Sequence, residues 1–260
     1  MKIIKNTVIL IVLVSTTMTA DFLKIEMGAG AYSSTPSGKV SYSASGVIAN
    51  DISIEKESKN PYVWAYIKHP LPILPNIRLE YSSLQTQGVA NGVFENFIAF
   101  DSNTELNLNE YDIIPYYNIL DNTGWITFDL GIDIKVIDVD YKADKVGFTS
   151  LPGETTITAF SSSYNDSSML VIPLIYTRVR LEIPSTDLAL EADAKFVKYS
   201  STTVYDARVK LDYTLSILPV LEPAIEVGYR VQKYNIDEAE LDGKANLEFS
   251  GIYIGAIVRF

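Results

Sequence analysis

Few side chains in this sequence could carry out catalysis. It contains no cysteine and a single histidine, His69, so it offers no thiol nucleophile, no Cys-based metal site and no disulfide. Acyl and peptide chemistry needs a base that titrates near neutral pH, and histidine is the usual choice. His69 stands beside Pro70 at the end of a predicted strand, where a structural role is the better interpretation. We therefore expect no catalytic residue.

Carboxylates are the second candidate for chemistry. Residues 235–244 (NIDEAELDGK) gather acids of the kind that bind Ca²⁺, but their spacing matches no EF-hand, so we interpret them as a solvated acidic loop. Asp206 and Asp212 could act on a water molecule as a pair. Arg208 and Lys210 lie between them on the same face, which favours a structural ion network. We expect no metal and no cofactor.

The charge balance excludes one class of partner. Of the 260 residues, 21 are Lys or Arg and 32 are Asp or Glu, which gives a net charge of −11. A chain this acidic has no electrostatic reason to bind nucleic acid. Its apolar content of 47% is that of a folded protein, and its main compositional skew is a high number of tyrosines, 17 in all.

The first twenty residues have the pattern of a secretory signal peptide. Lys2 and Lys5 precede an apolar run at residues 7–14 (TVILIVLV), and small or polar residues follow up to Ala20. The run is too short for a membrane-spanning helix, which needs roughly 20 apolar residues. We expect cleavage after Ala20, so that residues 1–20 form the signal peptide and residues 21–260 form one domain of an exported protein.

The remaining chain alternates apolar and polar residues with period two, which predicts an all-β protein. The clearest predicted strands are residues 23–32, 76–82, 126–136, 188–196, 205–213, 223–231 and 250–260. Weaker ones are residues 62–68, 106–117 and 169–181. Together they predict about ten strands, with eight or twelve as the alternatives. Twelve would result if residues 41–55 paired as an extra hairpin.

The connections between these strands alternate in length. Short ones rich in Pro, Asn and Asp occupy residues 70–75, 118–124, 183–187 and 215–221. Long polar ones occupy residues 33–60, 83–105, 137–168 and 232–248, and only residues 198–203 are brief on that side. This pattern is typical of a transmembrane, up-and-down antiparallel β-barrel, with tight turns at one end and long loops at the other.

Glycines indicate which face of the strands is the interior. Gly28 and Gly30 share a face with Lys24 and Glu26, and Gly131, Gly228, Gly251 and Gly255 likewise lie among charged residues. Small residues are needed where the walls of a narrow barrel crowd together, so the polar face is predicted to point inward. The apolar face then points to lipid, whereas a soluble barrel would have the opposite arrangement.

Aromatic residues at the strand ends support this orientation, because Tyr and Trp prefer the headgroup region of a membrane. The predicted girdle residues are Tyr117, Tyr213 and Phe260 at the turn side, and Tyr81, Phe196, Tyr205 and Tyr229 at the loop side.

The last predicted strand has an aromatic C-terminal residue and a regular apolar face. Phe260 ends the chain, and Ile252, Ile254, Ala256 and Val258 precede it on the same face. This pattern resembles the C-terminal recognition strand of bacterial outer-membrane barrels, which the barrel-assembly machinery reads. That machinery is therefore an expected partner during biogenesis.

Three segments resemble one family of small Gram-negative outer-membrane β-barrels that has no assigned activity. They are residues 21–32 (DFLKIEMGAGAY), residues 60–84, in which HPLPILPNIRLEY is the most specific stretch, and residues 111–122 (YDIIPYYNILDN). The resemblance implies a location in the cell outer membrane, with the lipid bilayer and lipopolysaccharide as surroundings. It implies no chemistry.

The inward face carries acids and bases in near balance. The predicted lumen charge network consists of Lys24, Glu26, Arg78, Glu80, Asp129, Asp133, Lys135, Glu191, Asp193, Lys195, Asp206, Arg208, Lys210, Asp212, Glu226, Arg230 and Arg259. Opposite charges in so narrow a lumen are expected to pair and fill it. This favours a structural or surface-interaction protein. The alternative is a narrow porin-like channel for ions or small solutes. A third, less favoured hypothesis is that the protein is an outer-membrane enzyme.

Overall fold

The computed structural model describes residues 23–44, 47–48, 53–54, 58–71, 73–94, 97–150, 155–215, 221–238 and 243–260. The predicted signal peptide lies outside these ranges and stays a prediction. Every regular element within them is a β-strand. No helix in the described part of the chain is long and apolar enough to cross a membrane.

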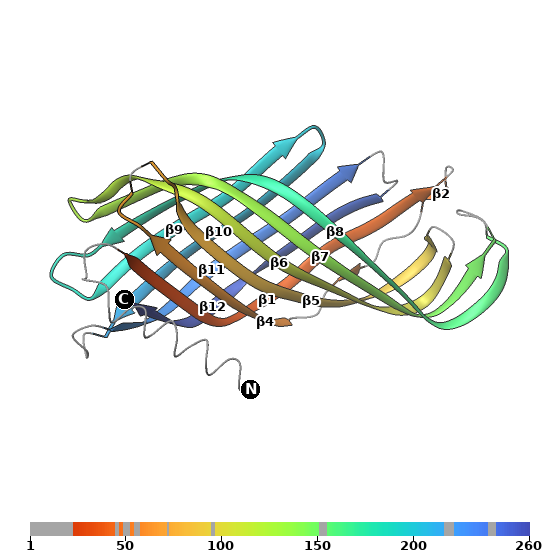
Figure 1. Ribbon diagram of the computed structural model, residues 1–260. Coiled ribbons are helices and arrows are strands. Elements are labelled where there is room, and N and C mark those ends of the chain that lie inside the picture. The colour runs from red at the N-terminus through yellow and green to blue at the C-terminus, as the bar shows by residue number, and fades with distance from the viewer. Residues whose placement is uncertain are drawn as a thin grey trace, which may run out of the picture.

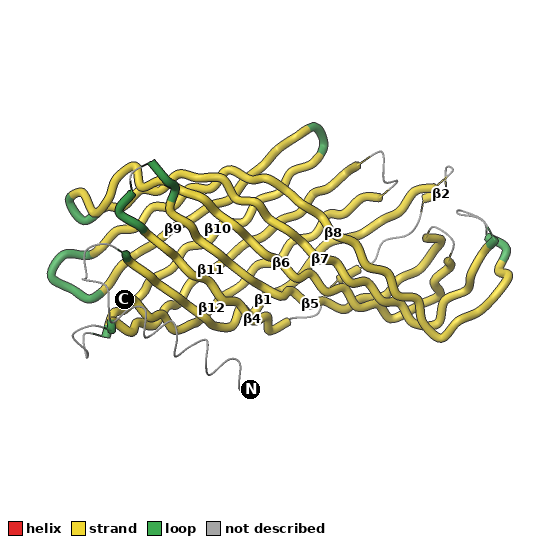
Figure 2. Tube along the Cα trace, viewed as in Figure 1, coloured by secondary structure: helices red, strands yellow, loops and turns green. Residues whose placement is uncertain are grey.

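Ten long strands form a closed antiparallel ring, as the alternating pattern predicts (Figures 1 and 2). They are β1 (Lys24–Ala44), β4 (Ser58–Lys68), β5 (Asn76–Phe94), β6 (Phe97–Thr123), β7 (Ile126–Thr149), β8 (Ile157–Glu182), β9 (Leu188–Tyr199), β10 (Thr202–Thr214), β11 (Glu222–Glu238) and β12 (Gly243–Arg259). Each pairs with its neighbours in sequence, and β1 pairs with β12 to close the ring. Closure leaves the backbone hydrogen bonds satisfied within the wall, as a spanning sheet requires.

The two remaining strands, β2 (Val47–Ile48) and β3 (Ser53–Ile54), are two residues long each. β2 pairs with the end of β1, and β3 pairs with β5. Neither enters the ring, so the described chain forms the ten barrel strands that were predicted and not the alternative of twelve.

The two ends of the barrel differ, as Figure 1 shows. Tight turns join β6 to β7 and β8 to β9, and Gly124, Trp125 and Ser185 have positive φ angles of 60°, 72° and 64° in them. The C-terminus lies at this turn side. At the opposite end, the hairpins β5–β6 and β7–β8 extend far beyond the short hairpin β9–β10, which turns at residues 200–201. We call this opposite end the hairpin side.

The long polar connections predicted at the hairpin side are largely strands instead of loops. β7 continues to Thr149 and β8 begins at Ile157, so most of residues 137–168 is paired β-structure. The prediction of loops is wrong because these segments do alternate apolar and polar residues. Their apolar side chains point inward and their polar ones outward, which is the reverse of a membrane strand.

The reversal is clearest on β7. In its lower part Leu130, Ile132 and Ile134 are 45%, 57% and 41% exposed and face outward, while Asp133 and Lys135 are buried. Above Val136 the outward positions become polar, with Asp140 and Lys142 exposed, and Ile137 is buried. β6 reverses at the same level, since Leu106 and Leu108 are buried above the buried Glu110.

The wall therefore has two zones with one continuous register. The lower zone presents apolar side chains outward and encloses charge, as a lipid-embedded barrel does. The upper zone presents polar side chains outward and encloses apolar ones, as a barrel surrounded by water does. The boundary between the zones marks the upper edge of the lipid-facing belt.

A proline in β8 does not disturb the sheet. Pro173 pairs with Ile134 of β7 in continuous register, although proline inside a closed barrel would normally remove a ladder hydrogen bond. The pairing between β8 and β9 begins only at Ile175. Pro173 thus lies beyond the last residue of β8 that pairs with β9.

The lipid-facing zone makes a prediction about substitution. Arginine at the bilayer midplane of such barrels costs about 2–4 kcal/mol, and the cost falls toward the interfaces. We expect Ile132→Arg to lower the free energy of unfolding by that amount, measured by urea titration in lipid vesicles. Asp140→Arg, on the same strand in the upper zone, is the control and should change stability little. Equal losses in the two variants would contradict the assigned belt.

Candidate functional site

The barrel interior is filled with charged side chains. Fourteen of the predicted network residues are less than a tenth exposed, and Asp112, on the same inward face, is buried with them. All fifteen belong to ring strands: Arg78, Glu80, Asp112, Asp129, Asp133, Lys135, Glu191, Asp193, Lys195, Asp206, Arg208, Lys210, Asp212, Glu226 and Arg230. Buried charges are tolerated only when they are paired and hydrogen-bonded. Whether the interior could bind or pass a solute therefore depends on how these charges are paired.

At the turn side, arginines and acids form a chain of ion pairs. Arg259 Nη2 lies 2.9 Å from Asp212 Oδ1, and Arg180 Nη1 lies 2.5 Å from Asp212 Oδ2. Glu191 joins this group to the next, because its Oε2 accepts from Arg180 at 3.3 Å and from Arg178 at 2.7 Å. These residues come from β8, β9, β10 and β12, so the chain ties together a large part of the wall.

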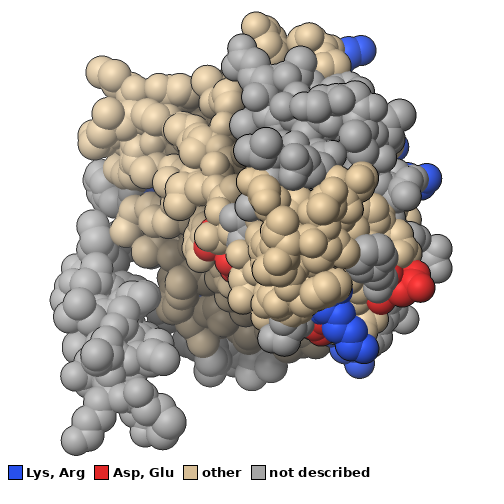
Figure 3. Space-filling model, turned by 90° about the vertical axis from the view of Figure 1, so that its right-hand side faces the viewer, with Lys and Arg blue, Asp and Glu red and all other residues tan. Residues whose placement is uncertain are grey.

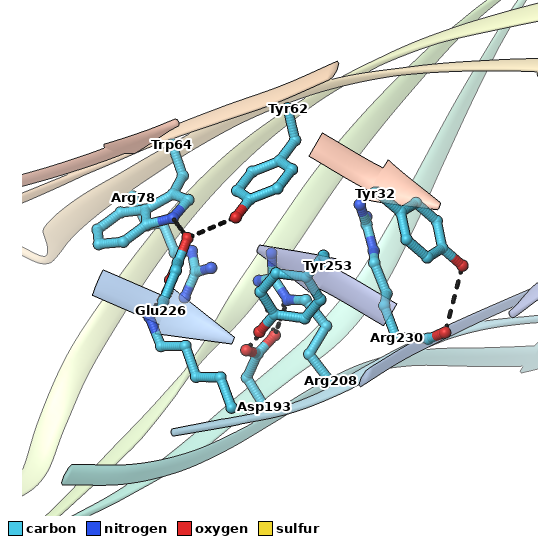
Figure 4. Close-up of a pocket in the computed structure, with 10 residues that line it drawn as sticks. Tyr32, Tyr62, Trp64, Arg78, Asp193, Arg208, Glu226, Arg230 and Tyr253 are labelled. Atoms are coloured by element: carbon cyan, nitrogen blue, oxygen red, sulfur yellow. Dashed lines mark hydrogen bonds and ion pairs between the residues drawn. The ribbon is translucent and has the colours of Figure 1, made fainter. Parts of the chain in front are cut away.

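Glu226 of β11 is the acceptor for two aromatic side chains from β4, which lies three strands away around the ring (Figure 4). Tyr62 Oη donates to its Oε1 at 2.8 Å, and Trp64 Nε1 donates to the same oxygen at 3.2 Å. The other oxygen, Oε2, lies 3.0 Å from Lys210 Nζ. Both carboxylate oxygens are thereby engaged, across the lumen from β11 to β4.

Two further centres lie above this one. Lys195 Nζ bridges Glu80 and Asp112, each at 2.7 Å. Arg208 from β10 contacts both oxygens of Asp193 and, at 2.6 Å, Glu80 Oε1. Each cation thus contacts two acids, a geometry that holds the side chains in place more firmly than single pairs would.

The top of the charged interior is a layer that the sequence prediction partly missed. Arg230 makes a two-bond contact with Asp206, with distances of 2.6 and 2.9 Å. Glu110 is fully buried and was not among the predicted residues. Its carboxylate accepts hydrogen bonds from Tyr234 and Gln232, and Lys135 lies 3.4 Å away. Glu110 lies two residues before Asp112 in the predicted strand 106–117, so the period-two pattern itself could have placed it on the inward face.

Buried aromatic rings account for much of the tyrosine skew. The guanidinium of Arg78 lies 4.4 Å from the ring centre of Tyr66, and that of Arg178 lies 4.6 Å from the same ring. Tyr66 Oη and Tyr176 Oη are 2.9 Å apart. The tyrosines predicted from the sequence to have a role were those of the two girdles only. Tyr117, Tyr213 and Tyr229 do face outward, but the rings that fill the lumen are a second population: Tyr32, Tyr62, Tyr66, Tyr116, Tyr176, Tyr234 and Tyr253.

Glycines make room for these rings. A Cβ atom added at Gly228 would lie 2.6 Å from the Tyr253 ring, and one added at Gly28 would clash with the Trp64 ring. The crowding that the glycines indicated is therefore the contact of an aromatic side chain with a neighbouring backbone.

Three residues of the predicted network, all at the turn-side rim, are not buried. Lys24 is exposed at the end of β1 and pairs in register with Lys68, so its predicted place in the lumen network is wrong. At the rim of a barrel water is available, and a like charge opposite removes any reason to turn inward. Glu26 and Arg259 lie 3.2 Å apart at this rim and are partly exposed.

His69 is held by the turn between β4 and β5. Its Nδ1 accepts from the Leu71 backbone N–H at 3.1 Å, and its Nε2 lies 3.0 Å from the Pro75 carbonyl oxygen. Both ring nitrogens are therefore engaged by the backbone. The acidic segment 235–244 lies partly outside the described residues, and no group of acids that could hold a metal ion occurs within them.

Little space remains between the lumen side chains. The cavity bounded by Trp64, Arg78, Arg208 and Glu226 has a volume of about 10 Å³, roughly what one water molecule needs. Figure 4 shows the aromatic and charged side chains that fill this part of the lumen. A passage for solutes would require several of these side chains to move.

The last strand has the predicted facing. Ile252 and Ile254 are 61% and 58% exposed on the lipid side, Ala256 shares that face, and Val258 and Phe260 are half-buried. Its use as an assembly signal stays a prediction.

Solved outer-membrane proteins share this fold. The outer membrane protease OmpT from Escherichia coli superposes with a TM-score of 0.52 at 11% identity, over 95% of this chain and 99% of that one. The attachment invasion locus protein Ail of Yersinia pestis gives 0.36 at 10% identity, over 92% and 99%. Neisserial surface protein A gives 0.32 at 11% identity, over 92% and 97%. No family model and no curated protein matches the sequence. The chain thus has the fold and apolar belt of an integral outer-membrane barrel.

The buried pairs make a prediction about stability. Asp206→Ala leaves Arg230 buried without its two-bond partner, and removing one member of a buried pair costs about 3–5 kcal/mol. We expect a loss of that size in the free energy of unfolding in lipid vesicles. The control is Asp121→Ala, which breaks the ion pair between Asp121 and Lys68. The side chain of Asp121 is 56% exposed and that of Lys68 is 27% exposed. Exposed pairs contribute about 0–1 kcal/mol, so similar losses in both variants would contradict a structural role for the network.

Proposed function

We propose that this protein is a closed outer-membrane barrel that supports the upper-zone hairpins for contacts at the cell surface, and that it neither conducts solutes nor catalyses a reaction. The observation that supports the closed lumen most directly is its filling, since the space between the central charges is about 10 Å³. A hydrated pore would require free charges along a continuous path.

The contacts of the lumen charges support the same proposal. Glu226, Asp212 and Glu191 each contact cationic or hydrogen-bonding groups from at least two strands; for Glu191 these are Arg178 of β8 and Lys210 of β10. An ion crossing the lumen would have to replace these contacts one after another. Networks of this kind hold the wall rigid and fix its shape.

The absence of catalysis is inferred from the only imidazole in the sequence. His69 lies in a turn, both of its ring nitrogens are held by the backbone, and the turn belongs to the end opposite the long hairpins. The likeness to a protease concerns the fold alone, at 11% identity.

The hairpin side supports a role in surface contacts. Its strands turn polar side chains outward above the belt, and in Figure 3, which looks onto this end, a few charged groups lie scattered among the uncharged residues of the described surface. Loops and hairpins placed on a rigid scaffold are the usual carriers of recognition.

The first experiment is conductance in planar bilayers with the refolded full-length mature chain. We expect no stable conductance steps from the wild type. The variant Trp64→Ala/Arg78→Ala removes two large side chains from the central filling and should show small steps, which demonstrates that the protein inserts. Large, stable steps from the wild-type protein would refute the closed lumen.

A second experiment tests which end faces outward, using the absence of native cysteines. We expect Asp140→Cys in the upper zone to react with a membrane-impermeant maleimide on intact cells. Ser185→Cys, in the β8–β9 turn, should react only after the cells are lysed. The reverse pattern would place the hairpins in the periplasm and exclude a cell-surface role.

A further inference from the structure

An apolar chamber lies above the charged interior, between the upper parts of the long strands. It has a volume of about 200 Å³. Its walls include Leu106 and Leu108 of β6, Ile137 of β7, Leu170 of β8, Ile236 of β11 and Leu247 of β12. A dry apolar cavity of roughly 150 Å³ is enough to bind benzene. The volume of the chamber is therefore larger than that of a packing defect, and it can hold part of an apolar ligand.

The chamber is closed below. Tyr234 forms part of its lining and donates to Glu110, the highest buried acid of the charged interior. Gln232 donates to the same carboxylate at 2.7 Å. A ligand that enters the chamber thus meets a charged layer and has no path through the barrel.

One polar atom in the chamber lacks a partner. Tyr141 lines the chamber, and its hydroxyl is buried without a hydrogen-bond partner among the described residues. A buried hydroxyl is normally hydrogen-bonded. A ligand with an acceptor oxygen next to its apolar part would satisfy it.

The wall is interrupted beside the chamber because the hairpin β9–β10 is short. β8 pairs with β9 only as far as Ile175, while β8 itself continues to Ile157. β10 pairs with β11 as far as Asn235. Above these points no strand of the described chain lies between β8 and β11, and Leu170 and Ile236 line the chamber on the two sides of the gap. In Figure 1 the tip of the β9–β10 hairpin diverges from β8.

The gap opens at the upper edge of the lipid-facing belt. Met169 and Val171 of β8 face outward beside it and are 68% and 62% exposed. Phe196 of β9 is 46% exposed just below. Leu170 pairs with Ile137, the residue at which β7 changes polarity. What lies next to the opening is therefore the hydrocarbon of the membrane and its headgroups.

We propose that the chamber accepts one acyl chain of a membrane lipid, which enters sideways between β8 and β11. The chain packs against the leucine and isoleucine side chains, and an ester oxygen at its head accepts a hydrogen bond from Tyr141. Lys198, exposed near the tip of the β9–β10 hairpin, matches an acidic headgroup at the entrance. This inference does not depend on the proposed function and holds whether or not the hairpins bind a surface partner.

The test is an NMR measurement on the mature chain in nanodiscs with protonated lipids. The protein is deuterated except for its Leu and Ile methyl groups, and intermolecular NOEs to lipid methylenes are recorded. We expect NOEs at Leu108 and Leu247 in the chamber as well as at the lipid-facing Ile132 and Ile254. Ile114, which is buried in the charged interior, should show none.

A matched pair of variants locates the bound chain. Ala245 lines the chamber, so Ala245→Phe should fill it and reduce the NOE at Leu108 to the level of Ile114. Asn246→Phe adds the same ring at the exposed neighbouring position and should leave that NOE unchanged. Unchanged NOEs at Ile132 and Ile254 show that each variant keeps its fold. Absent lipid NOEs at Leu108 in the wild type, NOEs to water there instead, or an NOE that survives Ala245→Phe would each overturn the proposal.

Discussion

The pairing of charges out of reach of water is the constraint on which this barrel depends. Its lower zone is surrounded by hydrocarbon, so the interior is the only place for polar side chains, and a ring of ten strands is too narrow to hydrate them all. The strands must therefore bring each acid next to a base across the lumen. Arg208 illustrates this, since it contacts Asp193 on the neighbouring strand and Glu80 from the far wall. The aromatic rings that pack against glycine backbones occupy the volume that the ion pairs leave.

Much of this architecture can be predicted from the sequence, because in a lipid-facing strand the two faces carry opposite chemistry. The period-two pattern predicts the ring of strands, and the position of glycines among charged residues indicates the inner face. Which charge pairs with which cannot be predicted, since contacts such as Lys195 with Glu80 depend on strand tilt and on the register across the lumen. Glu110 was missed although it lies in the predicted strand 106–117, because Leu106 and Leu108, which precede it on the same face, are apolar and did not mark that face as the charged interior.

The upper zone shows that residue polarity alone is not enough to tell a strand from a loop. The segments around Leu106 and Val139 alternate as regularly as the membrane strands, but their apolar residues point inward. Their polar residues are as frequent as those of loops, so composition suggests a loop while periodicity suggests a strand. Periodicity predicts the structure better here. A strand that leaves the membrane keeps its backbone pairing, and only the surroundings of its outer face change, from lipid to water.

The polarity change also determines how deep the protein sits. Neighbouring outward positions on β7 pass from Val136 to Asp140 within a few residues, at a rise of about 3.3 Å per residue. A downward shift of the barrel would drag carboxylates into hydrocarbon, and an upward shift would bring leucine and isoleucine side chains into water. Since the outward side chains of β6 and β7 change from apolar to polar at the same level, the depth at which the barrel sits in the membrane is fixed. Such a protein is matched to membranes of one hydrocarbon thickness, and a thicker or thinner bilayer would have to deform around it.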